Sequence, residues 1–146
     1  MTAHVIVVGF DGSDHSISAL RWSVEEARTH GSSVQTVTVA PLDSDDGAVA
    51  ALEDMQQRAI DSVLDRLPIS REVVRGDPVE AMVDLSMHAS LVVLGRHGTS
   101  SLIHAGLGSV ADACARLCHC PVVVVPPHPP ETGSEAGVSP EDVALR

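Results

Sequence analysis

The chain has 146 residues, a length typical of one domain, and its 20 acidic side chains against nine basic ones give a formal net charge of −11. All nine basic residues are arginines, which excludes a lysine-dependent P-loop, and they are too dispersed to form the basic stripe that a nucleic-acid partner requires. The apolar run at the N-terminus is too short for a signal peptide or a membrane span, so we expect a cytoplasmic protein with no membrane partner.

Short apolar runs alternate with longer helical stretches, which is the pattern of a parallel sheet covered by helices. The first run, 4–9, is a predicted strand, and a helix is predicted from about 16 to 31 because its apolar positions recur every three or four residues. A second strand, rich in β-branched residues, is predicted at 34–40. Pro41 ends it, and a helix is predicted at 47–67.

The third strand and helix carry the clearest local signal. Residues 71–75 form a short predicted strand that is charged at both ends, which favours a position near a sheet edge. Asp77, Pro78 and Glu80 then supply a cap, a proline at the first helical position and a carboxylate at the third. A helix is therefore predicted over 78–89.

The last part of the chain completes the alternation. A fully buried strand is predicted at 91–95, a helix at 109–117 and a fifth strand at 121–125. Residues 126–146 are rich in proline, glycine, serine and acidic side chains without an apolar period, so we expect a disordered tail. The single folded domain is then 1–125.

Two predicted loops, 9–13 and 95–109, contain unusual residues. Each follows the carboxyl end of a predicted strand, where open parallel sheets bind ligands. Glycines in the second loop permit positive φ and let the main chain approach a ligand closely. The Ser109 hydroxyl is predicted to cap the following helix, whose N-terminus offers N–H groups to a phosphate. Taken singly, each of these residues is better explained as a turn former or a helix cap than as a ligand-binding residue.

The spacing of four residues, taken together, favours a binding site. Gly95, Gly98, Gly108 and Ser109 follow a GxxG, nine-residue gap, G(S/T) pattern that resembles the ATP-binding branch of the universal stress protein family. The likeness covers nearly the whole folded part, including VIVVGFDGS, GDP and GLGSVADACARLCHCPVVVVP. It implies a three-layer α/β fold, Rossmann-like and similar to the adenine nucleotide alpha hydrolases, with a five-stranded parallel sheet in order 3-2-1-4-5.

The resemblance also implies a ligand, ATP, with Mg²⁺ as a candidate companion ion. Asp11 would lie near the ribose and phosphates and help to hold the metal, although without the resemblance it is better explained as a turn former. Val39 would line the adenine pocket. Gly9 is also expected to line the cofactor site. The implied roles in ribose and phosphate binding fall on Gly95, Gly98, Gly108, Ser109 and Val110.

Charged and metal-binding side chains leave alternatives open. Arg96 either complements phosphate charge or points to solvent, and His97 either contacts phosphate or ribose or is a solvent-facing loop residue. No spacing suggests a nucleophile with its base, so no catalytic residue is predicted. The three cysteines lack the recurring pairs of a zinc site, and buried packing thiols are predicted instead. They are Cys114, Cys118 and Cys120.

These observations predict a nucleotide-dependent signalling module of the stress response, with at most slow hydrolysis. An oligomeric interaction protein of the same fold with an empty pocket, and a slow Mg-dependent ATPase, remain alternatives. Electron transfer or nucleotidyl transfer is disfavoured, because no GxGxxG follows the first strand. The apolar strand 121–125 would be an open edge, which predicts a homodimer through that strand, as the resemblance also implies.

Overall fold

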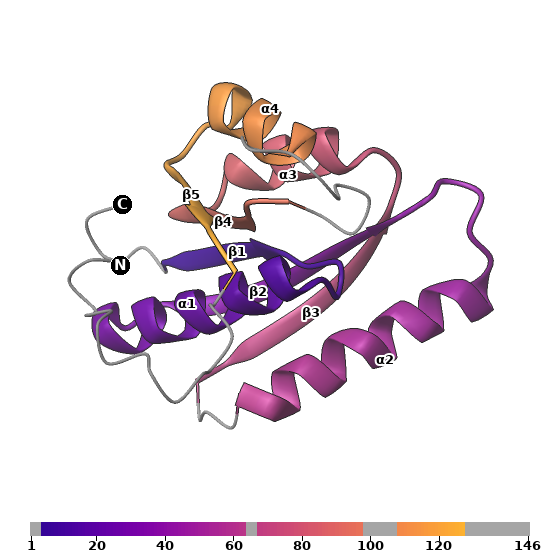
Figure 1. Cartoon of the computed structure of the whole chain (residues 1–146), viewed down its shortest axis with the longest axis horizontal. Coiled ribbons are helices and arrows are strands. Elements are labelled where there is room, and N and C mark those ends of the chain that lie inside the picture. The colour runs from indigo at the N-terminus through magenta and orange to yellow at the C-terminus, as the bar shows by residue number, and fades with distance from the viewer. Residues whose placement is uncertain (1–3, 64–66, 98–107, 128–146) are drawn as a thin grey trace, which may run out of the picture.

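The computed structural model describes residues 4–63, 67–97 and 108–127, in which strands alternate with helices (Figure 1). All paired strands are parallel, in the order β3-β2-β1-β4-β5, which confirms the predicted α/β fold and strand order. The strands are Val5–Gly9 (β1), Ser33–Ala40 (β2), Ile69–Arg75 (β3), Leu91–Gly95 (β4) and Val122–Val125 (β5). The helices are Asp14–His30 (α1), Asp46–Val63 (α2), Pro78–Ser86 (α3) and Ser109–Leu117 (α4).

Helices cover the sheet on both faces. α1 and α2 lie on one face, and α3 and α4 lie on the other (Figure 1). Alternate residues of β1 supply the two cores: Ile6 and Val8 pack against α1, whereas Val7 packs in the same cluster as Met82 of α3. This double burial explains why β1 and β4 are continuous apolar runs rather than alternating ones.

The chain reverses its winding direction between β1 and β4. β1 pairs with β2 on one side and with β4 on the other, so it lies in the middle of the sheet. The loop after β1 leads to α1 on one face, and the loop after β4 leads to α4 on the opposite face. In an open parallel sheet, such diverging loops leave a crevice beyond the carboxyl ends of the two strands.

The ends of α1 follow from its caps. α1 begins two residues earlier than predicted because the Ser13 Oγ accepts a hydrogen bond from the Ser16 N–H at 3.2 Å. The helix ends before Gly31, which has a φ of 71° and a backbone N–H bonded to the Ala27 carbonyl. The predicted end near Gly31 is confirmed, because glycine adopts this left-handed conformation at little cost.

The predicted start of α3 is confirmed, since the Asp77 carboxylate accepts a hydrogen bond from the Glu80 N–H at 2.9 Å. α3 ends at Ser86, however, three residues before the predicted end. β3 begins two residues earlier than predicted, because Ile69 already pairs with Val34 of β2. α2 is described as far as Val63, and the predicted continuation passes through residues outside the described part.

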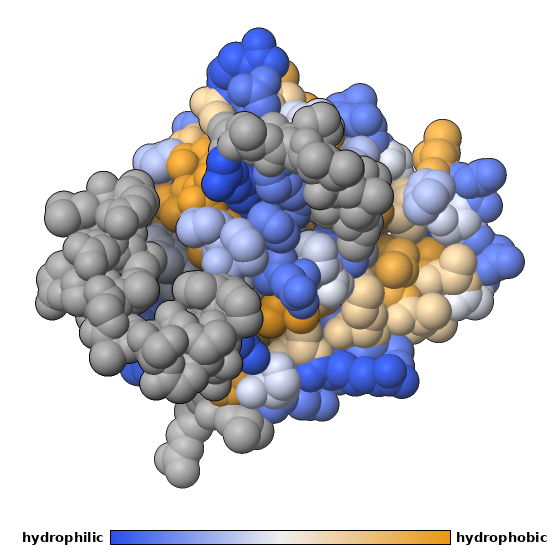
Figure 2. All heavy atoms as spheres, viewed as in Figure 1, coloured by the Kyte–Doolittle hydropathy of each residue, from blue (hydrophilic) through white to orange (hydrophobic). Residues whose placement is uncertain are grey.

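α2 is the most exposed of the four helices, and Figure 2 shows apolar residues at the surface over its first half. Its apolar side chains Met55, Ala59 and Val63 pack against the core but are only partly buried. The one fully buried side chain of α2 is instead Gln56. Its Nε2 donates to Thr38 Oγ1 at 2.9 Å and to the Glu72 carbonyl at 2.8 Å. A polar anchor therefore fastens α2 to β2 and β3.

None of the described helices is long and apolar enough to cross a membrane. The predicted tail is described only at its first two residues, and 128–146 lie outside the described part.

We predict that Gln56→Leu lowers the free energy of unfolding by about 1–3 kcal/mol, because it leaves buried carbonyl oxygens without their donor. Gln57→Ala is the matched control: Gln57 is exposed and bonds only to surface side chains, so a change within about 0.5 kcal/mol is expected. Urea unfolding of both variants makes the comparison. Equal losses would show that the anchor contributes nothing particular.

Candidate functional site

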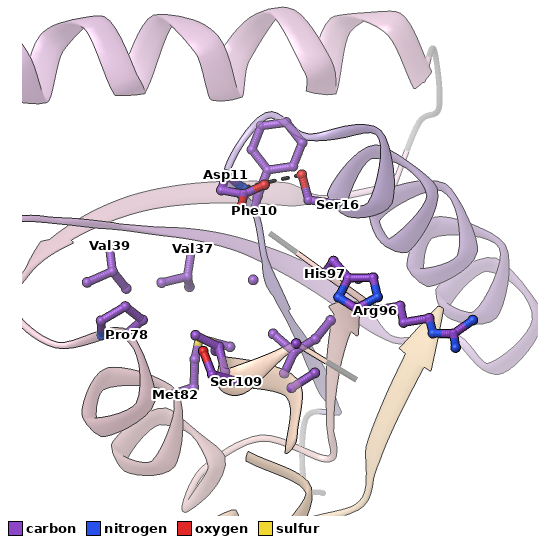
Figure 3. A pocket seen from close by; sticks show the side chains of 16 residues that line it. Phe10, Asp11, Ser16, Val37, Val39, Pro78, Met82, Arg96, His97 and Ser109 are labelled. Carbon is purple, nitrogen blue, oxygen red and sulfur yellow. Dashed lines mark hydrogen bonds between the residues drawn. The ribbon is translucent and has the colours of Figure 1, made fainter. Parts of the chain in front are cut away.

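A cavity of about 260 Å³ opens beyond the carboxyl ends of β1, β2 and β4 and is closed by the starts of α3 and α4 (Figure 3). It coincides with the crevice that the winding reversal creates. All predicted site residues that the structure describes line it: Gly9, Asp11, Val39, Gly95, Arg96, His97, Gly108, Ser109 and Val110. The remaining predicted residue, Gly98, lies outside the described residues.

One end of the cavity is apolar. Val37 and Val39 of β2 face Pro78 and Met82 of α3 across it (Figure 3). Sequence reasoning identified only Val39. Its neighbour Val37 was detectable, because residues two apart on a strand share a face. Pro78 and Met82 were noted only as parts of a helix, and their place at the site depends on how α3 folds back on the sheet.

The backbone of Val39 also faces the cavity. Pairing of β1 with β2 ends at Gly9 opposite Val37, and the Phe10 N–H then donates to the Val37 carbonyl at 2.8 Å. Alternate residues of a parallel strand direct their N–H and C=O groups to the same neighbour, so Val39 directs its own toward the place that β1 has left. No backbone hydrogen bond joins β1 to Val39 in the described residues.

The opposite end of the cavity is the N-terminus of α4. The prediction that Ser109 caps this helix is wrong, since the cap is Gly108 and makes no side-chain hydrogen bond, while Ser109 is the first helical residue. A side chain at Gly108 is disfavoured because its Cβ would lie 3.1 Å from the Arg96 carbonyl oxygen. The N–H groups of the first turn, from Ser109 to Ala111, therefore border the cavity without a side-chain cap.

The described glycines of the second loop act through packing. Neither Gly95 nor Gly108 has a positive φ, so that part of the prediction is wrong for both. A Cβ at Gly95 would instead lie 2.6 Å from the His15 Cβ and 2.7 Å from the His15 carbonyl carbon. The close approach that glycine permits here is between the end of β4 and the first turn of α1.

Asp11 combines a turn with a position on the cavity wall. Its Oδ1 accepts a hydrogen bond from the Ser13 N–H at 3.0 Å, and its own N–H donates to the Ser16 Oγ at 3.3 Å (Figure 3). The turn-forming interpretation is therefore confirmed, and the exposed carboxylate still borders the cavity. It is the only carboxylate among the described lining residues.

His97 and Arg96 follow β4 and line the cavity. The solvent-facing interpretation of His97 is wrong, because its exposed fraction is only 9%. The His97 N–H donates to the Nδ1 of His15 at 3.3 Å, and the two rings meet edge to face with centroids 5.3 Å apart. Arg96 is half-buried and borders the same space. His15, which sequence reasoning did not assign, carried no signal in the glycine pattern.

The prediction of buried packing thiols is confirmed for Cys114, whereas Cys118 and Cys120 are half-buried and pack against the same core. Cys114 lies in the core beside Met82, and burial, reinforced by Cys118, raises the pKa of its thiol to about 12. The Cys118 Sγ lies 3.8 Å from the Met82 carbonyl. Within the described residues, no group of three or more His, Cys, Asp or Glu side chains is placed to hold a metal ion.

We predict that Gly95→Ala lowers the free energy of unfolding by about 1–3 kcal/mol even without any ligand, because the first turn of α1 must move. Gly47→Ala is the control, since a Cβ there meets only Asp45 Oδ1, at 3.4 Å. Placed near the start of α2, it is expected to leave stability unchanged or raise it by up to about 1 kcal/mol. Urea unfolding without nucleotide measures both, and an unchanged Gly95→Ala protein would contradict the packing role.

The fold and the cavity define an open parallel α/β domain with a cleft where its winding reverses. A model of the universal stress protein family matches residues 2–126, and the chain belongs to this family. Universal stress protein Rv2624c of Mycobacterium tuberculosis is 30% identical over 132 residues, covering 85% of this chain and 48% of the relative. The chain thus spans about half the length of the curated relatives it matches.

Solved structures share this fold. Universal stress protein UspA from Lactobacillus plantarum has the same fold, with a TM-score of 0.75 at 21% identity, covering 86% of this chain and 99% of that one. A universal stress protein crystallised in complex with cAMP has a TM-score of 0.71 at 27% identity. The match covers 88% of this chain and 100% of the chain in that structure.

Proposed function

We propose that this chain is an ATP-binding module of the stress response, whose shape or partners change with bound nucleotide and which hydrolyses ATP slowly at most. The observation that carries the proposal is a single cavity with two unlike ends. One end offers an apolar slot beside an open strand edge, and the other offers the N-terminus of α4. A molecule that has a flat heteroaromatic ring and several phosphates matches both ends.

The apolar end suits an adenine ring. Val37, Val39, Pro78 and Met82 provide aliphatic contact on both sides of the slot. The N–H and C=O of Val39 face the same space, and this donor and acceptor pair can bond to the edge of a purine. Hydrogen bonds from these peptide groups would orient the base without adding charge to the apolar end of the cavity.

The α4 end suits phosphates. The chain carries a net charge of −11, so its overall field disfavours an anionic ligand, and local groups must offset it. The N–H groups and dipole of the first turn of α4 supply such an offset, and Arg96, which also lines the cavity, adds a positive charge to the local field. Gly98 is proposed to extend this cradle, by the spacing described above.

Mg²⁺ fits this site only as a companion of the nucleotide. Asp11 provides one carboxylate, and a shell of one carboxylate, phosphate oxygens and waters is ordinary for this ion. Bound there, Mg²⁺ would supply neutralisation of phosphate charge. Asp11 would hold the ion on the ribose and phosphate side while its Oδ1 keeps the loop after β1 in its turn.

The comparisons support the nucleotide class more directly than they support ATP. The cAMP complex concerns another member of the family, and it makes an adenine nucleotide the first ligand to test here. ATP is preferred because Gly95, Gly98, Gly108 and Ser109 follow the spacing of the ATP-binding branch. Within the described lining, Asp11, Arg96 and His97 are the ionisable side chains, a small set for efficient phosphoryl transfer.

We predict that Ser109→Glu weakens MgATP binding at least about tenfold, because a carboxylate at the first helical position repels phosphate. Folding is expected to be unharmed, since an acidic side chain in the first turn stabilises a helix by about 0.3–1 kcal/mol. Ala115→Glu adds the same charge to the same helix at an exposed position that does not line the cavity, so it should bind normally. Calorimetric titration of nucleotide-stripped protein makes the measurement.

Absence of MgATP binding by the unmodified protein would favour the interaction protein of the same fold with an empty pocket. Equal MgATP affinities of Ser109→Glu and the unmodified chain would show that the phosphates do not bind at the N-terminus of α4. Phosphate release followed in the same samples distinguishes a signalling module without turnover from a slow ATPase.

We also propose a cytoplasmic homodimer that pairs through β5, formed by the folded domain 1–125 with 126–146 as a tail. Within the described part of the chain, β5 is paired on one side only, and its four valines are all half-buried. The Val92 N–H bonds to the Pro121 carbonyl and the Arg96 N–H to the Val125 carbonyl, so odd-numbered residues of β5 face β4. Val122 and Val124 therefore turn their N–H groups outward, where a second copy can pair.

We predict that Val124→Pro shifts the dimer toward monomer with little loss of folding, because it removes an outward N–H. Val123→Pro is the comparison, since it removes an N–H that faces β4 and should destabilise the fold. Size-exclusion chromatography with light scattering gives the mass, and thermal unfolding gives the stability. An unmodified chain that is monomeric at high concentration would rule out the dimer.

A further inference from the structure

His15 sits behind the cavity rather than on its wall. It belongs to the first turn of α1 and does not line the cavity, although His97 and Arg96 do. Gly95 leaves no space between this turn and the end of β4, because a Cβ there would lie 2.6 to 2.8 Å from three atoms of His15. Any displacement of His15 is therefore transmitted to the residues that follow β4.

A hydrogen bond joins the two segments directly. The His97 N–H donates to His15 Nδ1 at 3.3 Å across 82 residues of sequence. A backbone amide can only donate, so Nδ1 must carry a lone pair, and the imidazole must be neutral with its proton on Nε2. A protonated His15 cannot accept this bond, and it would place a cation beside Arg96 and against the His97 ring.

We propose that His15 is a positioning residue: its neutral imidazole holds the segment 95–97 in the form that binds nucleotide, and its protonation weakens binding as the pH falls. This inference rests on the proposed function. It concerns a side chain that does not line the cavity and that acts through His97.

The electrostatic surroundings agree with a neutral imidazole. Burial, then His97 and then Arg96 lower the pKa of His15 below its ordinary value of 6.5, while Asp11 and Asp14 act in the opposite direction. The folded protein therefore resists protonation more than the unfolded chain does. The contribution to stability is complete above the unfolded pKa and is lost as the pH falls from there toward the folded pKa.

The test replaces His15 with asparagine, whose Oδ1 occupies the place of Nδ1, accepts a hydrogen bond and does not titrate. MgATP affinity is measured for both proteins at about pH 8 and about pH 5.5, on either side of the ordinary histidine range. The nucleotide titrates equally with both proteins, so its own protonation cancels in the ratio of affinities.

Equal affinities are expected at the higher pH, and at the lower pH His15→Asn should bind about twofold to fivefold more tightly than the unmodified chain. His15→Leu, which lacks an acceptor, should bind more weakly than His15→Asn at both values. A purely structural role would move affinity by the same factor at each pH. Parallel profiles for the unmodified chain and His15→Asn would therefore overturn the proposal.

Hydrogen exchange of the His97 amide separates this proposal from the proposed function, because it needs no nucleotide. After correction for intrinsic exchange, protection of that amide should fall between about pH 8 and about pH 5.5 in the unmodified chain and persist in His15→Asn. If no nucleotide binds at any pH, the proposed function fails while this measurement still decides the role of His15. Protection that does not change with pH in the unmodified chain would overturn it.

Discussion

The contact between the first turn of α1 and the end of β4 sets the geometry of the crevice. α1 continues directly from the loop after β1, so when Gly95 lets His15 approach the backbone of β4, it also fixes the spacing between the two loops. The chain then returns at Gly108, whose N–H bonds to the Arg96 carbonyl at 2.7 Å. Two glycines that allow backbone to meet backbone thus set the distance from the strand ends to α4.

The fold was predictable because its local signals agree with one another. Buried parallel strands are continuous apolar runs, Gly31 marks the end of α1, and Asp77 and Pro78 mark the start of α3. Gln56 was not predictable, because periodicity assigns apolar side chains to a buried helix face. Its amide is buried there because it supplies the hydrogen bonds that oxygen atoms of β2 and β3 accept.

The candidate site was found mainly from the spacing of its glycines, and its physical basis differs in part from what that spacing suggested. Gly95 and Gly108 were expected to serve a ligand through free backbone angles, and they serve the packing of the chain on itself. Val37 and Met82 come from segments that the glycine pattern does not include, and His15 reaches the site through a contact between α1 and the end of β4. Such residues depend on tertiary geometry, which no local pattern encodes.

The hydroxyl of Thr38 has a consequence for the ligand side of the sheet. It donates to the Phe10 carbonyl at 2.7 Å, and that carbonyl is the group to which the Val39 N–H would bond if β1 and β2 paired for one more step. The Nε2 of Gln56 in α2 donates a hydrogen bond to the same hydroxyl. Contacts on the α2 face of the sheet thus keep the edge of β2 at Val39 unpaired beside the cavity. Substitutions on that face, which the nucleotide does not touch, can therefore change how the base is bound.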